Sequence, residues 1–185
     1  MKAVNEVGPG RILRFLWASI LRSALKLTWL PPIRAMFLRL FGAKIGANSI
    51  VNGVTFINVD RGGFKALQIG ANCFIGDEAL FDLASPIVIE DHVSIGQRSM
   101  ILTHLNVGYS DHPLQGRFPK QTAPCVIRRG SFIGAGAIVL AGTTIGPEAF
   151  VAAASLVNRD VAAGELVGGV PIKSIERRES TETRA

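Results

Sequence analysis

Two of the three histidines in this chain, His104 and His112, lie in the polar stretch ILTHLNVGYSDHPLQGRF, which covers residues 101–118. The third, His92, lies in the mainly aliphatic segment before it. Imidazole has a pKa of about 6.5, so a histidine can take a proton from a hydroxyl group at neutral pH and pass it to a leaving group. Either histidine of this stretch is therefore a candidate general base.

The segments on both sides of this stretch repeat every six residues. An aliphatic residue recurs at each sixth position, a small residue often stands two positions before it, and glycine often follows it, as in IGANSI and IGAGAI. This period fits neither an α-helix nor a β-meander, and it predicts a parallel β-helix in which each unit forms one short strand and one turn of a triangular prism. The predicted inward positions are Ile45, Val51, Ile57, Ile69, Ile75, Phe81 and Ile87, then after an offset of two Ile89, Ile95 and Ile101, and finally Ile127, Ile133, Val139, Ile145, Val151 and Val157.

The repeat is interrupted between Val107, the next expected inward position, and Ile127. The segment 108–124 is polar and contains several prolines, so it is predicted to leave the prism as an external loop. His104 lies at the root of this loop, where the scaffold would hold it in place, and is the preferred base. His112 lies on the loop itself, which can fold back over a groove, and is the alternative.

Two carboxylates are candidates for orienting His104 through its second ring nitrogen. They are Asp82 and Asp111, although a backbone carbonyl would serve equally well. His92 occupies a turn position where asparagine is common, so it is interpreted as structural. Neither cysteine of the chain lies beside a histidine in the sequence, and a covalent acyl-enzyme is not required by the expected chemistry.

The first 42 residues follow a different pattern, that of a basic amphipathic helix with a wide apolar face. Pro31 ends this helix, and a second short helix follows it. The uncharged run 15–21 is far shorter than the roughly 20 residues of a membrane-spanning helix. Two interpretations remain open: residues 11–30 lie in the plane of a membrane surface, with Trp17 and Trp29 near the headgroups, or the helix packs on the main domain or on a partner subunit.

The composition indicates one globular domain. The chain has 185 residues, 48% of them hydrophobic, and a formal net charge of +6, which favours an anionic partner. Because no basic run is interleaved with aromatic residues, nucleic acid is not expected as a partner. The two cysteines lack the spacing of a zinc site or a disulfide framework, and no secretory signal is recognisable, so a cytoplasmic location is predicted, with contact at the inner face of the membrane as an option.

The C-terminal half carries a family resemblance. The run CVIRRGSFIGAGAIVLAGTTIGPEAFVAAASLVNRDVAAGELVGGVPIKSI resembles the hexapeptide-repeat acyltransferases, and within them the maltose, galactoside and polysaccharide O-acetyltransferases. The resemblance implies a left-handed parallel β-helix, a homotrimer with active sites in the grooves between subunits, and transfer of an acetyl group from acetyl-CoA to a hydroxyl of a sugar, glycan or lipid-linked saccharide. It also implies that His104, in the motif LTH at the root of the loop, is the catalytic base.

The same resemblance implies where acetyl-CoA binds. Small residues of the last coils would line a slot for the pantetheine arm, backbone amides would contact the thioester, and basic residues would contact the phosphates. The sequence departs from the family pattern at Phe132, where tryptophan is usual, and at Ile172, where alanine is usual. The residues implied to bind the cofactor are Gly134, Ala135, Gly142, Ala152, Ala153, Ser155, Arg159 and Lys173.

The predicted organisation has three parts: a helical segment 1–42, a β-helix 43–161 with the loop 108–124, and a C-terminal cap and tail 162–185. Two alternative functions stay open, N-acetyl transfer to an amino sugar and a non-catalytic trimeric scaffold. A zinc site like that of the γ-class carbonic anhydrases, which share this helix, is not expected, because no two histidines have the required spacing. No metal is therefore predicted.

Overall fold

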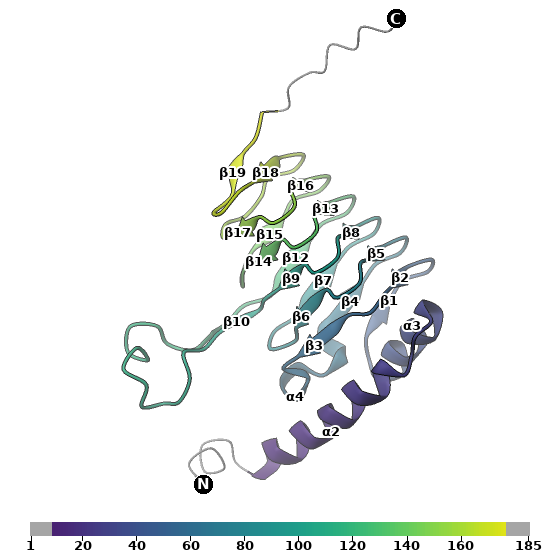
Figure 1. The fold of residues 1–185 in the computed structure, drawn as a ribbon, viewed down its shortest axis with the longest axis vertical. Coiled ribbons are helices and arrows are strands. Elements are labelled where there is room, and N and C mark those ends of the chain that lie inside the picture. The colour runs from purple at the N-terminus through teal and green to yellow at the C-terminus, as the bar shows by residue number, and fades with distance from the viewer. Residues whose placement is uncertain (1–8, 177–185) are drawn as a thin grey trace, which may run out of the picture.

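The structure is a computed structural model, and it describes residues 9–176. Its main body is a prism of stacked coils, with helices at the N-terminal end and a long hairpin projecting from one side (Figure 1). Each coil contributes one strand to each of three parallel sheets, which we name A, B and C in chain order. The predicted parallel β-helix is therefore confirmed.

The strands are short, as a period of six residues requires. Sheet A contains β1 (Lys44–Ile45), β4 (Leu67–Ile69), β7 (Ile87–Ile89), β12 (Cys125–Ile127) and β15 (Thr144–Ile145). Sheet B contains β2 (Ile50–Val51), β5 (Phe74–Ile75), β8 (Ser94–Ile95), β13 (Phe132–Ile133), β16 (Phe150–Val151) and β18 (Leu166–Gly168), with β19 (Lys173–Ser174) antiparallel at its end. Sheet C contains β3 (Thr55–Ile57), β6 (Leu80–Asp82), β9 (Met100–Ile101), β14 (Ile138–Val139) and β17 (Leu156–Val157).

The interior of the prism consists of the predicted aliphatic residues, stacked in register from coil to coil. Ile95, Ile133 and Val151 are fully buried and pair along sheet B. Glycine follows Ile95 and Ile133 because the next coil approaches too closely there for a side chain: a Cβ on Gly134 would lie 2.4 Å from the backbone nitrogen of Ala153.

Two predicted inward positions were wrong, and the first of them is Ile57. Phe56, not Ile57, pairs with Phe81 and is 2% exposed. The shift by one residue lets the Phe56 ring pack edge-on against Phe64 and Phe81, with centroid distances of 5.3 and 6.0 Å. Edge-on contacts between aromatic rings are favourable, so they stabilise the register of β3 with Phe56 inside the prism.

The coils differ in length because the chain leaves the prism at one edge only. A regular coil takes 18 residues, from Ile127 to its partner Ile145. The three earlier coils are longer, and each places its extra residues between sheet C and sheet A. These extra residues are the short helices α4 (Val59–Gly62) and η1 (Phe64–Ala66), the segment 83–86, and the hairpin that follows Thr103. We call this the C–A edge; it comprises residues 58–66, 82–86, 103–124, 140–143 and 158–160.

The hairpin begins earlier than the predicted loop 108–124. Its stem is an antiparallel ribbon of β10 (His104–Leu105) and β11 (Gln121–Thr122), so His104 is itself the first residue of the excursion. Val107 does not enter the prism, and Ile127 takes the place expected for it, paired with Ile89. Six-residue counting placed the departure too late because it cannot detect pairing within the excursion.

The C-terminal coils also extend past the predicted boundary at residue 161. Strand β18 continues sheet B in register with β16, and β19 then folds back on β18 as a cap. The part of the predicted tail from residue 177 onward lies outside the described residues.

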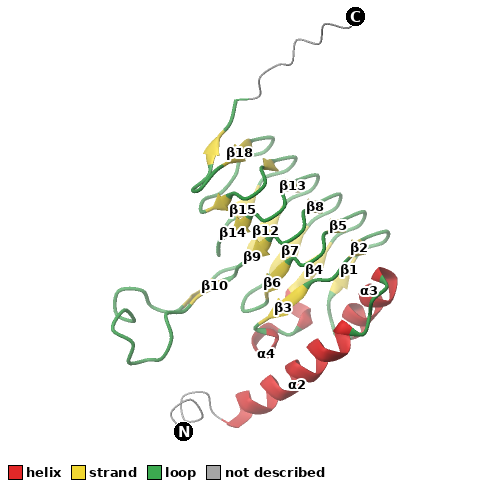
Figure 2. Cartoon of the chain, viewed as in Figure 1, coloured by secondary structure: helices red, strands yellow, loops and turns green. Residues whose placement is uncertain are grey.

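Two helices cover the N-terminal end of the prism, α2 (Pro9–Lys26) and α3 (Pro31–Leu40) (Figure 2). Leu38 is fully buried beneath them, and the buried Arg34 donates from Nη1 to the carbonyl oxygen of Val51 at 3.1 Å. Within residues 9–176, no helix is both long enough and apolar enough to cross a membrane. The α3 helix packs against β1 and β2, so it covers the first coil of the prism.

Candidate active site

The C–A edge brings together a histidine, a buried carboxylate and an amide from three successive coils. The His104 side chain is 23% exposed, and its Nδ1 is hydrogen bonded to Oδ2 of Asp82, which is fully buried. Asn58, one coil below Asp82, donates from Nδ2 to Oδ1 of Asp82 at 2.6 Å and lies 3.4 Å from His104 Nδ1. The sequence offered Asp82 and Asp111 as orienting residues, and the structure places Asp82 on the ring.

The hydrogen bonds around Asp82 define the state of the histidine ring. Oδ2 also accepts the backbone N–H of Thr103 at 2.9 Å, and Oδ1 accepts that of Ala84 at 3.1 Å. A carboxylate can only accept hydrogen bonds, so His104 Nδ1 must carry a proton. In the neutral ring the lone pair is then on Nε2, for which the described residues provide no hydrogen-bond partner. This nitrogen is available to a substrate.

Asp82 is ionised at neutral pH despite its burial. Burial raises the pKa of this carboxyl, but the hydrogen bonds from His104, Asn58 and the Thr103 backbone outweigh it and hold the pKa below its usual range. Thr103 adds a further tie, since its Oγ1 donates to the backbone oxygen of Asp82 at 2.6 Å and accepts the N–H of Ser85 at 3.0 Å. The carboxylate is therefore both charged and rigidly placed.

The other two histidines, His112 and His92, lie in turns and contact neighbouring groups there. His112 lies on the exposed hairpin loop, where its Nδ1 accepts the backbone N–H of Leu114 at 3.1 Å. Asp111 lies in the same exposed turn. His92 has a positive φ of 59°, as the asparagine-like turn position predicted, and its Nε2 lies 3.4 Å from Asn72 Nδ2 one coil below. These placements favour His104 over His112 as the base.

Asn58 and Thr103 were not singled out in the sequence. Asn58 precedes α4 with a positive φ of 55°, and Thr103 precedes the hairpin, so both stand where the chain leaves the prism. The three interruptions of the six-residue repeat fall after Ile57, Asp82 and Thr103, and their coincidence on one edge was the available signal.

The residues implied to bind the cofactor lie on two different edges of the prism. Gly134, Ala135, Ala152 and Ala153 form stacked turns between sheets B and C, with the Ala154 N–H donating to the Ala135 oxygen at 2.9 Å. We call this the B–C edge. Ser155 is buried there, and its Oγ accepts the Gly169 N–H at 3.2 Å.

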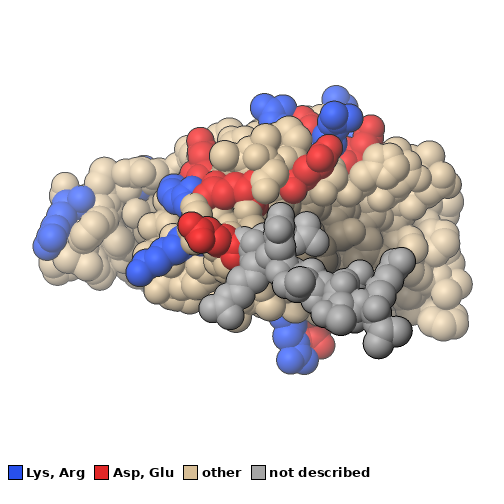
Figure 3. Space-filling view, turned by 90° about the horizontal axis from the view of Figure 1, so that it is seen from above, with Lys and Arg blue, Asp and Glu red and all other residues tan. Residues whose placement is uncertain are grey.

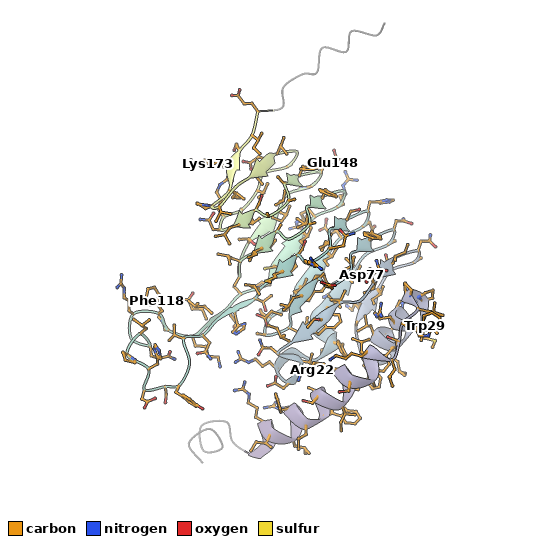
Figure 4. All side chains as sticks on the ribbon, in the orientation of Figure 1. Arg22, Trp29, Asp77, Phe118, Glu148 and Lys173 are labelled. Atoms are coloured by element: carbon orange, nitrogen blue, oxygen red, sulfur yellow. The ribbon has the colours of Figure 1, made fainter. Side chains whose placement is uncertain are left out.

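The remaining cofactor residues are closer to His104 or at the C-terminal end. Gly142 has φ +82° and packs against Ala123, whose N–H donates to Thr103, so it lies one coil above His104 on the C–A edge. Arg159 follows on the next coil of the same edge. Lys173 is exposed on β19 at the C-terminal end (Figure 4). A single chain therefore does not assemble these residues into one pocket.

Arg159 is paired with an acidic residue. Its Nη2 and Nη1 donate to the Glu165 carboxylate at 3.0 and 3.4 Å, and Glu165 also accepts from Ser174 Oγ and the Ala162 N–H. Acidic and basic side chains lie next to one another on this end of the prism (Figure 3). The Arg159 charge is thus partly neutralised before any phosphate arrives.

Replacing Glu165 by glutamine should loosen the C-terminal cap in a pH-dependent way. The hydrogen bonds from Arg159, Ser174 and Ala162 lower the pKa of Glu165 from 4.5 to about 2. Because the folded pKa is the lower one, the ionised side chain stabilises the fold above about pH 4.5 and this contribution is lost as the pH falls toward 2. We expect E165Q to lower the melting temperature by about 2 °C at pH 7. Thermal unfolding from pH 7 to 2.5 checks this; a difference that does not shrink in acid would rule out the charge as its cause.

The cysteines are not placed for nucleophilic chemistry. Cys73 and Cys125 are both buried, and burial raises the pKa of each thiol. Cys125 Sγ is directed at the backbone oxygens of Leu102 and Leu140. Among residues 9–176, no three His, Cys, Asp or Glu side chains lie close enough together to hold a metal ion.

The stacked hexapeptide coils with an inserted hairpin define a class of proteins, and comparisons with known proteins place the chain within it. Residues 124–159 match the family model described as "Hexapeptide repeat of succinyl-transferase". The chain is 32% identical over 158 residues to WcaF of Escherichia coli (strain K12), whose name assigns it to acetyl transfer in colanic acid biosynthesis; the match covers 83% of this chain and 82% of WcaF. The chain therefore belongs to the hexapeptide-repeat acyltransferases.

Solved structures agree with this assignment. A hexapeptide-repeat acetyltransferase of Vibrio cholerae O1 biovar eltor, complexed with acetyl coenzyme A, is 29% identical, with a TM-score of 0.72 over 85% of this chain and 87% of its own. A galactoside acetyltransferase in complex with coenzyme A shares the fold, with a TM-score of 0.77, 20% identity, and coverage of 92% and 84%. The protein is thus an acyltransferase by family and by fold.

Proposed function

We propose that the protein transfers the acetyl group of acetyl-CoA directly to a hydroxyl of a sugar or glycan, with His104 as the general base. One observation carries this proposal: the hydrogen bond to buried Asp82 keeps the proton of the His104 ring on Nδ1, and this leaves the lone pair of Nε2 available to a substrate. The Vibrio cholerae relative holds acetyl-CoA, which supports the same donor here.

The transfer needs only one proton carrier. As the sugar oxygen attacks the thioester carbon, Nε2 of His104 accepts the hydroxyl proton, and the ionised Asp82 stabilises the imidazolium that forms. When the tetrahedral intermediate collapses, the carbon–sulfur bond breaks and Nε2 returns the proton to the CoA thiolate. Backbone amides near Gly142, one coil above, are the proposed donors to the oxyanion.

We further propose a left-handed coil and a homotrimer. In the single chain, the base is on the C–A edge, whereas Gly134, Ala135, Ala152, Ala153 and Ser155 are on the B–C edge. Three copies about a threefold axis would set the B–C edge of one copy against the C–A edge of the next, so that one groove contains both sets. Lys173 and Arg159 would then contact the CoA phosphates, and Arg159 would give up part of its hydrogen bonding to Glu165.

An acetyl-CoA assay against a panel of sugars, read by mass spectrometry, tests this function. An O-acetyl product is cleaved by mild alkali, whereas the N-acetyl product of the alternative function survives it. Calorimetric titration with CoA separates both from the scaffold alternative, which predicts no binding. No CoA binding, or no acetylated sugar under any condition, would reject the proposal.

The N-terminal helices support a proposal of membrane contact. The apolar side chains facing away from the prism are each more than half exposed: Leu13, Leu16, Trp17, Ile20, Leu27, Trp29, Met36 and Leu40. Trp29 is on the outer side of this layer (Figure 4). No acidic residue occurs between Glu6 and Asp60, while Arg14 and Lys26 make no side-chain ion pair or hydrogen bond within residues 9–176. A surface that combines exposed apolar and unpaired basic side chains fits the interface of an anionic bilayer at the cytoplasmic face.

Replacing both Trp17 and Ile20 by serine should weaken vesicle binding at least tenfold. Each of these side chains contributes about 1.5–3 kcal/mol when it is moved from water into an apolar phase. Co-sedimentation with vesicles containing phosphatidylglycerol measures the effect, with Val170→Ser, an exposed apolar position at the other end of the chain, as the control. If the double variant binds vesicles normally but loses its oligomeric state in light scattering, the helices pack on a partner subunit instead.

A further inference from the structure

A cavity lies beside the His104 site, between α2, α4 and the hairpin. Its volume is about 390 Å³. The side chains that line it include Arg11 from α2, Arg61 from α4, and Asn106, Tyr109, Gln115 and Lys120 from the hairpin. Three cations from three separate elements therefore converge on one space.

The positive charge of this cavity is only partly compensated. Arg11 forms an ion pair with Asp60 at 3.2 Å, but none of the described residues that line the cavity is acidic. Among the described residues, Nε and Nη1 of Arg61 are buried without a hydrogen-bond partner. The pKa of Lys120 is lowered, mainly by the positive charge of Arg61 and to a smaller extent by burial and by the charge of Arg11. The cations of the cavity are therefore close enough to repel one another. Arg61 as a whole is half-buried, but buried N–H donors without a partner are costly unless an anion accepts from them.

One of the uncharged lining residues, Gln115, is compatible with an anion. Oε1 of Gln115 is also buried without a partner among the described residues, and its amide can turn by 180° to present N–H donors instead. Guanidinium and amide groups together supply the planar donor pattern that carboxylate and phosphate oxygens prefer.

Two of the residues that line the cavity lie close to the candidate base in the hairpin stem. In the hairpin stem His104 pairs with Thr122 and Leu105 with Gln121, so Asn106 and Lys120 come next, facing each other two residues from His104. Two residues of strand span about 7 Å, which is comparable with the width of a hexose ring. On the other side, Asn58, which touches His104, is followed three residues later by Arg61.

We propose that this cavity binds an anionic group of the acceptor, a carboxylate or a phosphate carried by the saccharide, and so selects acidic sugars. The inference rests on the proposed function, because it describes how that same site takes its acceptor. Bound by Lys120, Arg61 and Arg11, the anionic group would anchor a sugar ring with one of its hydroxyls at Nε2 of His104. It also accounts for the hairpin, which supplies Lys120 and closes the cavity.

Matched acceptors test the selection. Methyl glucoside is the neutral probe, methyl glucuronide has the same ring with a carboxylate, and glucose 6-phosphate has the phosphate. We expect kcat/KM to be about ten- to hundredfold higher for at least one charged probe, and Lys120→Gln to remove that preference. Lys65→Gln, an exposed cation on η1 outside the cavity, is the matched control. Equal kcat/KM for charged and neutral probes would overturn the inference.

A binding measurement separates this inference from the proposed function. Methyl glucuronide and inorganic phosphate are titrated into the full-length protein with CoA present, so that the phosphate contacts of CoA are already filled. Wild type and Lys65→Gln should bind one of the two probes, whereas Lys120→Gln and Arg61→Gln should bind it at least tenfold more weakly. Lys120 is on an exposed loop, so its variant should keep the wild-type melting temperature. Anion binding that depends on Lys120 without any acetyl transfer would reject the function alone; acetyl transfer without such binding would reject the inference alone.

Discussion

Substitution of His104 by alanine is expected to lower kcat for acetyl transfer by about 10³-fold. A positioned general base contributes about 10²- to 10⁴-fold, and no other described side chain at the C–A edge has a free proton acceptor in this position. The KM for acetyl-CoA should change little, because the residues implied to bind the cofactor lie on other turns. Steady-state kinetics with varied acetyl-CoA and a fixed acceptor measure both quantities.

His112→Ala is the matched control for this variant. Its ring is exposed on the hairpin and accepts a local backbone N–H, so its removal should change kcat by less than about twofold. If His104→Ala keeps more than a tenth of the wild-type rate, His104 is not the base. If His112→Ala shows the larger loss, the loop closes over the groove and the base is His112.

Substitution of Asp82 by asparagine is the second large effect, with an expected loss of about 10²- to 10⁴-fold in kcat. The two carboxylate oxygens accept hydrogen bonds from four groups: Asn58, the Ala84 N–H, the Thr103 N–H and His104 Nδ1. An asparagine has one oxygen, so its NH₂ would face donors on one side. His104 is then stabilised with its proton on Nε2, where it cannot accept the proton of the acceptor hydroxyl.

Asp82 could position the base or could only support the fold, and the tautomer of His104 separates these two explanations. If Asp82 only supported the fold, its replacement would not change that tautomer. The ¹⁵N chemical shifts of the His104 ring should report a proton on Nδ1 in the wild type and on Nε2 in Asp82→Asn. The variant also leaves a buried donor unpaired, which should cost about 1–3 kcal/mol of stability. A variant with the wild-type tautomer but low activity would show that Asp82 supports the fold and does not position the base.

The prism explains why these residues can be so well placed. Asn58, Asp82 and His104 come from coils that are stacked by parallel pairing, with Phe56 next to Phe81 and Phe81 next to Ile101. The aliphatic core beneath them is fully buried. Side chains that extend from such a stack keep their mutual distances, because moving one would disturb the packing of its neighbours.

The sequence alone determined the repeating part of the molecule. A step of six residues with buried aliphatic side chains fits one regular structure, the parallel β-helix. The glycine that often follows the inward residue is explained by the close approach of the coils, as at Gly134. His104 could be singled out for the same reason, because an interruption is visible against a strict period. The division of the N-terminal segment into two helices was equally local, although the first helix ends at Lys26 and Pro31 begins the second helix, where its missing N–H costs no hydrogen bond.

Only the tertiary structure decided which distant residues meet at the site. Asn58, Asp82 and His104 are separated by 24 and 22 residues, and their contact depends on how many residues each coil inserts, which the period does not contain. The start of the hairpin at His104 depends on pairing with Thr122, and the shift from Ile57 to Phe56 depends on packing against Phe64. A period specifies contacts between neighbouring units, whereas the chemistry of this protein depends on the places where the period breaks.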